Sequence, residues 1–194
     1  MQGTLIAVAA TTISMSLVLA ATSAGQTAES MPTVAANAEL AAELDDATII
    51  AIFDAANTAD IETGELAMQR GESKEVRDFG AMLARDHQNV RQQGRDLARR
   101  LGVTPTPPAG DAHAKAHELA MAELRSLHGT EFDHAFLQHE VAFHKAVLDA
   151  VKTTLLPAIR NAEIRDLVVK VAPAFQAHMM AAESLDRRLY GASK

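Results

Sequence analysis

The fold is decided by the stretch APAFQAHMMAAESLDRRL, residues 172–189. Its apolar residues recur every three or four positions, which is the spacing of one face of an α-helix. That face carries His178 between Phe175 and Ala182, at a position where an amphipathic helix usually has leucine. We therefore expect this stretch to form a helix that directs His178 into the core of a helical protein.

Two more histidines occupy core positions on other predicted helices. His87 lies at helical spacing from Leu83, and His144 lies at helical spacing from Leu148. A polar group buried without a partner costs about 1–3 kcal/mol, so each imidazole needs a partner inside the protein. Three such histidines on three helices predict a polar centre in the core, either a metal site or a hydrogen-bond network.

Composition and charge exclude several classes of protein. Of the 194 residues, 48% are hydrophobic but only 4% are aromatic, which favours an all-α protein over a β-sandwich. The net charge of −7 argues against nucleic acid as a partner, because binding phosphates takes clustered lysine and arginine. The chain has no cysteine, which excludes disulfides, thiolate metal sites and covalent haem. It also has no glycine-rich phosphate loop, so we expect no nucleotide cofactor.

The N-terminus predicts export. Residues 5–20 are apolar and uncharged, and small residues follow at 21–24, so we predict a signal peptide over residues 1–24. No lysine or arginine precedes the apolar run, and retention of the leader as a membrane anchor is the alternative. A flexible tether is expected over residues 25–44. The expected location is the periplasm or another extracytoplasmic space.

Helix signals follow the tether along the rest of the chain. The predicted helices span residues 45–70, 73–101, 112–127, 130–154 and 161–171, with a last helix that begins near Pro173. Ser73 is the expected N-cap of the second helix. Thr130 to Asp133 resembles a capping box at the start of the fourth helix, and Pro157 is expected to end that same helix. We expect a four-helix bundle with two shorter connecting helices over residues 45–192.

Helix geometry tests which polar residues can meet. Glu140 and His144 lie four positions apart, so they share a face and are about 6 Å apart along the axis. Asp133 lies about 16 Å from His144 on the same helix, and we interpret it as the acidic residue of the capping box. Asp60 and His87 lie at similar distances from the turn between the first two helices. Their positions along the axis of the helix pair differ by about 4–5 Å, so their side chains can meet.

These residues form a candidate metal site. Carboxylate and imidazole ligands on facing helices are how helical bundles hold iron or manganese. We predict a transition metal, iron or manganese first and zinc or copper second, with the candidate ligands Asp60, His87, Glu140, His144 and His178. Asp86 points about 100° away from His87, so it either accepts a hydrogen bond from a neighbouring helix or faces water.

The alternative is a metal-free envelope or stress protein. In that case the same core side chains form a buried hydrogen-bond network, and function lies in contacts with protein partners. Whether the protein is an enzyme stays open. The chain has no cysteine and no serine in a nucleophile motif, so any activity is expected to be redox chemistry of a bound metal.

The ordered set of motifs resembles a known family. It begins with DIETGELA at residues 60–67 and continues through Val76, Phe79, Met82, Asp86, His87, Phe132, Asp133, His144, Pro173 and His178. This pattern resembles the exported bacterial domain-of-unknown-function family DUF4142. The resemblance implies a ferritin-like bundle and an envelope location, without an established activity. The family more often has glutamate where this chain has Asp60.

Overall fold

The computed structural model describes residues 44–108 and 112–191. The predicted signal peptide, and the predicted tether up to residue 43, lie outside the described residues. All regular elements within the described part of the chain are helical, which confirms the all-α prediction. None of these helices is long and apolar enough to cross a membrane.

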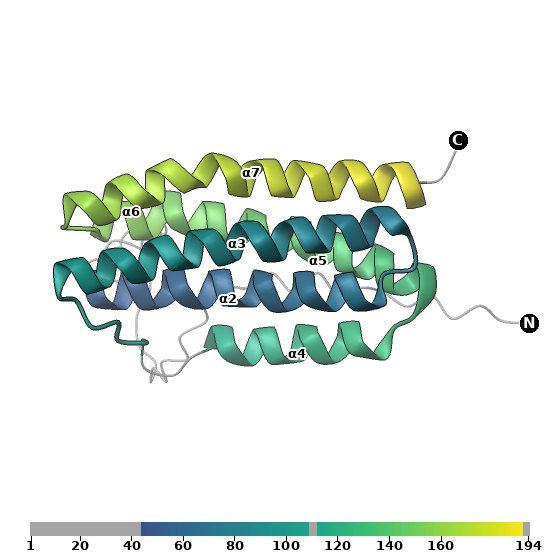
Figure 1. Cartoon of the computed structure of the whole chain (residues 1–194), viewed down its shortest axis with the longest axis horizontal. Helices are drawn as coiled ribbons and strands as arrows, with labels where there is room; N and C mark the ends of the chain where they lie inside the picture. Colours follow the sequence, from purple (N-terminus) through teal and green to yellow (C-terminus); the bar gives the residue numbers. More distant parts are fainter. Residues whose placement is uncertain (1–43, 109–111, 192–194) are drawn as a thin grey trace, which may run out of the picture. The chain divides into compact units, whose positions relative to one another are not determined.

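The first two helices form an antiparallel hairpin at the predicted positions. Helix α2 spans Asp46–Arg70 and helix α3 spans Lys74–Leu101 (Figure 1). The predicted cap is confirmed, because Ser73 Oγ accepts a hydrogen bond from the backbone N–H of Val76 at 3.1 Å. Two glycines let the helices pack closely: a Cβ atom on Gly80 would lie only 2.6 Å from the carbonyl oxygen of Gly64. The backbones of α2 and α3 therefore touch along this line.

Helix α4 spans Ala112–Ser126 and helix α5 spans Gly129–Ala150. The predicted capping box at the start of α5 is wrong: the N-cap residue is His128, and no side chain caps the helix. Asp133 instead is fully buried and accepts hydrogen bonds from the backbone N–H groups of Glu72 and Ser73, both at 2.8 Å. It also accepts one from the hydroxyl of Tyr190 at 2.7 Å. Asp133 thus satisfies the unpaired donors at the start of α3 from across the bundle.

Helical structure continues past Pro157, contrary to prediction. Helix α5 leads into a π-helical turn, η1 (Val151–Leu155), and then into the short α6 (Leu156–Ala158). Pro157 lies in α6, and the helix ends one residue later, at Ala158.

The last two predicted helices form a single one, α7, which spans Ala162–Tyr190 with Pro173 in its interior. Proline removes the N–H that would bond to the carbonyl of Val169. Val169 is 54% exposed, so water can hydrogen-bond to this carbonyl instead. The proline is tolerated because it falls on the solvent side of the helix.

Four of these helices form a closed bundle. Helix α2 contacts α3, α3 contacts α7, α7 contacts α5, and α5 contacts α2, whereas α4 packs outside against α2 and α5. Apolar side chains fill both ends, with Leu83 and Phe132 in one cluster and Ile49 and Leu97 in another. Between these ends lie the buried polar residues Asn57, Asp60, Thr63, His87, Glu140, His144 and His178.

Candidate metal centre

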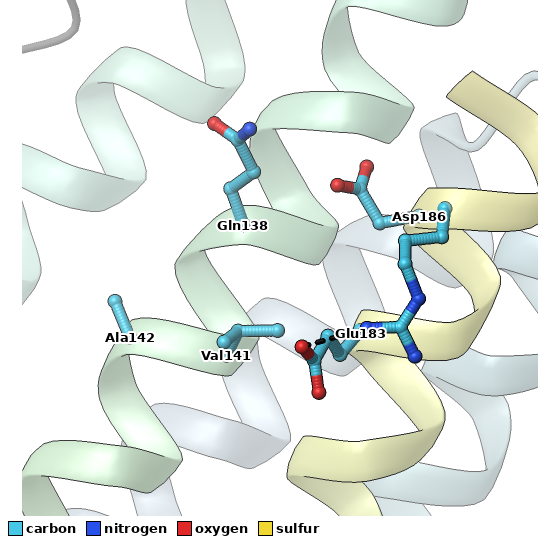
Figure 2. Close-up of a pocket in the computed structure, with 6 residues that line it drawn as sticks. Gln138, Val141, Ala142, Glu183 and Asp186 are labelled. Carbon is cyan, nitrogen blue, oxygen red and sulfur yellow. Dashed lines mark ion pairs between the residues drawn. The ribbon is translucent and has the colours of Figure 1, made fainter. Parts of the chain in front are cut away.

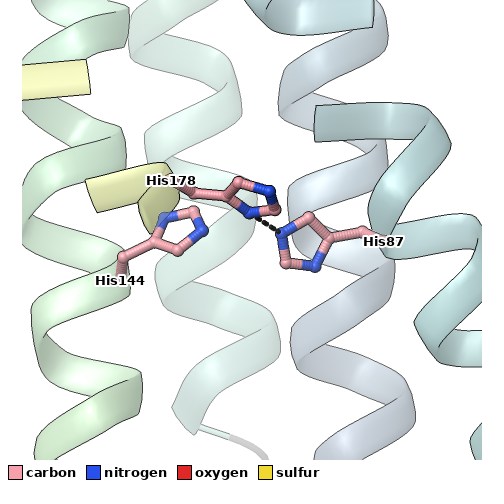
Figure 3. Close-up of side chains that lie close together, drawn as sticks. All are labelled: His87, His144 and His178. Atoms are coloured by element: carbon pink, nitrogen blue, oxygen red, sulfur yellow. Dashed lines mark hydrogen bonds between the residues drawn. The ribbon is translucent and has the colours of Figure 1, made fainter. Parts of the chain in front are cut away.

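The three core histidines meet in the middle of the bundle. His87 comes from α3, His144 from α5 and His178 from α7, and each is at most 5% exposed. Their ring centroids form a nearly equilateral triangle with sides of 5.1, 5.5 and 5.5 Å (Figure 3). One ligand nitrogen from each ring lies within 4.8 Å of the other two. The sequence prediction that the three histidines share one centre agrees with this geometry.

Asn57 fixes which nitrogen of His87 carries the proton. The Asn57 side-chain amide donates to the carbonyl of Phe53 at 2.7 Å, so its oxygen faces His87. That oxygen lies 3.0 Å from His87 Nδ1 and can only accept, so Nδ1 carries the hydrogen. Nε2 of neutral His87 then has a free lone pair, and it lies 3.2 Å from His178 Nδ1.

The same reasoning applies to His144. Its Nδ1 lies 3.0 Å from the backbone carbonyl oxygen of Glu140, which can only accept a hydrogen bond. Nδ1 therefore carries the hydrogen, and Nε2 carries the lone pair. Nε2 is buried without a hydrogen-bond partner. Since unpaired buried polar atoms are rare, this nitrogen marks a place for a ligand.

His178 connects the trio to Asp86. Its Nε2 lies 3.3 Å from Asp86 Oδ2, and a carboxylate can only accept. If Nε2 donates to Asp86, the lone pair on Nδ1 faces the lone pair on His87 Nε2. Two facing lone pairs at 3.2 Å repel unless a cation or an additional proton lies between them.

An additional proton is disfavoured on all three rings. Burial lowers the pKa of His87 to about 2 and that of His144 to about 4. Burial also lowers the pKa of His178, although Asp86 partly opposes this. The trio is therefore neutral at physiological pH, which is the form of histidine that binds a metal.

The spacing of one pair of nitrogens fits a metal ion. A tetrahedral zinc ion at 2.0–2.1 Å from its ligands places neighbouring nitrogens roughly 3.3 Å apart. The observed separation between His87 Nε2 and His178 Nδ1 is 3.2 Å. Each ring also has an acceptor behind it, as metal-bound histidines usually do.

Two buried carboxyl groups adjoin the trio. Asp60 Oδ2 lies 3.4 Å from His87 Nδ1, and Glu140 Oε2 lies 3.4 Å from His144 Nδ1. Asp60, Glu140 and His144 form a second group whose ligand atoms lie within 4.8 Å of one another. The five predicted ligands thus come together in two overlapping groups that share His144. The carboxyl oxygens lie nearest the Nδ1 atoms, on the side of both rings away from the free lone pairs.

The carboxyl pair holds a proton more tightly than exposed acids do. Burial raises the pKa of Glu140 to about 7, although the neighbouring Thr63 and Asp60 side chains partly oppose this. Burial and the neighbouring Glu140 raise the pKa of Asp60 well above its usual range. Asp60 Oδ1 and both oxygens of Glu140 have no hydrogen-bond partner. At neutral pH the pair therefore carries less than its full negative charge.

The sequence motifs are matched by a family model, described as a domain of unknown function (DUF4142), over residues 29–185. The chain belongs to the DUF4142 family. No curated protein and no solved structure matches the chain. The resemblance seen in the sequence is thereby confirmed, and the family description assigns no activity to this DUF4142 protein.

Two site residues of this DUF4142 protein were not identified from the sequence. Asn57 and Thr63 are both buried on α2, three positions before and three positions after Asp60. This i, i+3 spacing places all three on one face, so the polar stripe was a usable signal. Asp86 combines both roles considered for it, because it contacts His178 while its side chain stays 34% exposed.

The surface of the DUF4142 bundle has a shallow pocket of about 370 Å³ between α5 and α7 (Figure 2). Its six lining residues are Gln138, Val141, Ala142, Glu183, Asp186 and Arg187. It contains an ion pair between Arg187 and Glu183 at 2.7 Å, and none of its lining residues belongs to the histidine trio. This pocket therefore gives no access to the buried centre.

Proposed function

We propose that this protein binds one divalent transition-metal ion in the bundle core through His87, His144 and His178. The observation that carries the proposal is that each imidazole has a hydrogen-bond acceptor beside one ring nitrogen, which leaves the lone pair of its other nitrogen free. Asn57 and the Glu140 carbonyl each accept from one imidazole N–H, which leaves lone pairs directed inward. Asp86 does the same for His178.

Asp60 and Glu140 supply charge to this centre. A divalent ion in a dry core is costly unless negative charge lies close to it. Both carboxyl groups lie within 3.4 Å of an imidazole nitrogen of the trio. Their shortest contacts are to the hydrogen-bearing nitrogens, so their role in the proposal is to orient the rings and balance the charge of the ion.

The donor set also bears on the identity of the metal. Three imidazole nitrogens suit zinc, copper, iron and nickel, whereas manganese favours carboxylate oxygen. Of the metals predicted from the sequence, the trio therefore favours iron, zinc and copper over manganese. In an exported protein such a centre would store or buffer the ion, because ligands that are at most 5% exposed leave little room for an organic substrate.

The alternative is a metal-free hydrogen-bond network, which the 3.2 Å contact between His87 and His178 also suits. In that network His178 donates from Nδ1 to His87. Its Nε2 lone pair then faces the carboxylate of Asp86 at 3.3 Å, which is an unfavourable contact. This conflict is why we prefer the metal.

The test is elemental analysis of the protein purified without a metal-binding tag. We expect close to one equivalent of a transition metal per chain, and loss of it in the double variant His87→Ala/His144→Ala. The matched control is His134→Ala, because His134 is 45% exposed and pairs with Asp186 outside the centre. Absence of metal from the wild-type protein after reconstitution with iron, zinc and copper would contradict the proposal.

A further inference from the structure

One carboxylate beside the histidine trio reaches solvent. The side chain of Asp86 is 34% exposed, whereas those of His87, His144 and Asp60 are at most 4% exposed. Asp86 Oδ2 faces inward to His178 Nε2 at 3.3 Å, and Oδ1 faces Arg85 at 2.9 Å. Asp86 and His178 therefore connect the surface to the buried centre.

The position of this pair in the bundle also favours a route for ions. Asp86 lies on α3 and His178 lies on α7, so the pair bridges the seam between these two helices. The seam between α2 and α3 is closed by backbone, because Gly64 and Gly80 leave no room even for a Cβ atom. Asp86 and His178, by contrast, meet across the α3–α7 seam through their side chains.

We propose that Asp86 and His178 form an outer binding position where a divalent metal ion is held before it reaches the histidine trio. This inference rests on the proposed metal-binding function. The ligands of the outer position are Asp86 Oδ2 and His178 Nε2, whose separation of 3.3 Å equals that expected for two ligands of one ion, roughly 3.3 Å. Water completes the coordination, since Asp86 is partly exposed.

The two tautomers of His178 each suit one position of the ion. With hydrogen on Nδ1, His178 donates to His87 Nε2 at 3.2 Å and offers the Nε2 lone pair to an ion at Asp86. With hydrogen on Nε2, it donates to Asp86 and offers the Nδ1 lone pair to the inner centre. The two tautomers of neutral His178 differ only in which ring nitrogen carries the hydrogen. The number of protons on His178 does not change.

The charge of Asp86 also supports its role in the outer binding position. A partly exposed carboxylate raises the local concentration of cations and speeds their association. Arg85, whose side chain is 66% exposed, pairs with Oδ1 and offsets part of the negative charge that Asp86 offers to a cation. Loss of the Arg85 charge should therefore strengthen the attraction of Asp86 for a cation.

The experiment measures how fast the metal-free full chain takes up Co²⁺ in a stopped-flow instrument, using the visible absorption of the bound ion. We expect Asp86→Asn to slow association roughly tenfold while still binding one ion per chain. We expect Arg85→Gln to speed it. The matched control is Asp54→Asn, which removes the same charge from another arginine-paired carboxylate, 28% exposed and bonded to Arg95.

The outcomes separate this proposal from the function on which it rests. Slower association in Asp86→Asn, with wild-type kinetics in Asp54→Asn, supports the outer position. An unchanged association rate in Asp86→Asn overturns it, even if Co²⁺ dissociates faster, because Asp86 would then only orient His178. Equal slowing in both aspartate variants also overturns it, since net charge alone would explain that result. If the wild-type protein binds no Co²⁺, Zn²⁺, copper or iron, the proposed function fails as well.

Discussion

Replacing Glu140 with glutamine should change how the stability of the metal-free protein depends on pH. Glu140 is fully buried, and burial raises its pKa from 4.5 to about 7 in the folded protein. Between these two values the folded state keeps a proton that the unfolded state has lost. Wild-type stability therefore falls as pH rises through this window, and Glu140→Gln removes that loss because glutamine does not ionise.

The size of the effect follows from the pKa difference. Each pKa unit corresponds to about 1.4 kcal/mol, and the two pKa values bound a window from pH 4.5 to about pH 7. Over this range we expect wild type to lose about 2–3 kcal/mol of stability relative to Glu140→Gln. The buried histidines act in the opposite direction, because their lowered pKa values make the folded state gain stability as pH rises. Their pKa values are lowered chiefly by burial, which the substitution preserves, so most of their contribution cancels from the difference.

The assay is urea unfolding followed by circular dichroism at a series of pH values, with a chelator present. The control variant is Glu183→Gln, whose glutamate is 51% exposed and ion-paired with Arg187. It removes a carboxyl group at the surface and so gives the baseline for the comparison. A difference between Glu140→Gln and wild type that is independent of pH would refute the reasoning, because Glu140 would then ionise like an exposed acid.

Three further predictions concern the packing of the bundle, all measured by chemical unfolding. His144→Ala should lower the free energy of unfolding by about 2 kcal/mol or more, because His144 is buried. The exposed control His134→Ala should stay within about 0.5 kcal/mol of wild type, and equal losses of stability in the two variants would contradict the burial of His144. Gly80→Ala should destabilise the protein by about 1–3 kcal/mol, because the new Cβ would lie 2.6 Å from the carbonyl oxygen of Gly64. Alanine usually stabilises a helix relative to glycine, so a gain in stability would disprove this close contact. Asp133→Ala should cost about 3 kcal/mol or more because it leaves three donors without their acceptor, and a loss below about 1 kcal/mol would contradict that role.

Local sequence signals predicted much of the fold. Helix α2 begins and ends as expected, and Ser73 caps α3, because both depend on residues close together in sequence. The core positions of His87, His144 and His178 followed from apolar spacing alone. The spacing of apolar residues depends on the sequence of a single helix, so it can be analysed without knowing which elements the helix packs against.

Features that depend on distant parts of the chain could not be predicted in this way. Asp133 matched a capping box locally, yet it accepts hydrogen bonds from residues 60 and 61 positions away. Pro173 fits the start of a helix locally, yet packing keeps α7 continuous through it. Among the acceptors behind the histidines, Asp86 was considered from the sequence. The spacing on α2 could have placed Asn57 beside Asp60, but its contact with His87 is apparent only once α2 and α3 pack together.

The central claim is that three neutral imidazoles converge on one metal ion. X-ray absorption fine structure of the protein loaded with one equivalent of Zn²⁺ tests it most directly, because imidazole rings give a recognisable outer-shell scattering pattern. We predict nitrogen neighbours at about 2.0–2.1 Å and outer-shell scattering from three imidazoles, reduced to two in the single variant His144→Ala. A zinc shell of oxygen atoms without imidazole scattering, or the same spectrum in both proteins, would contradict the account.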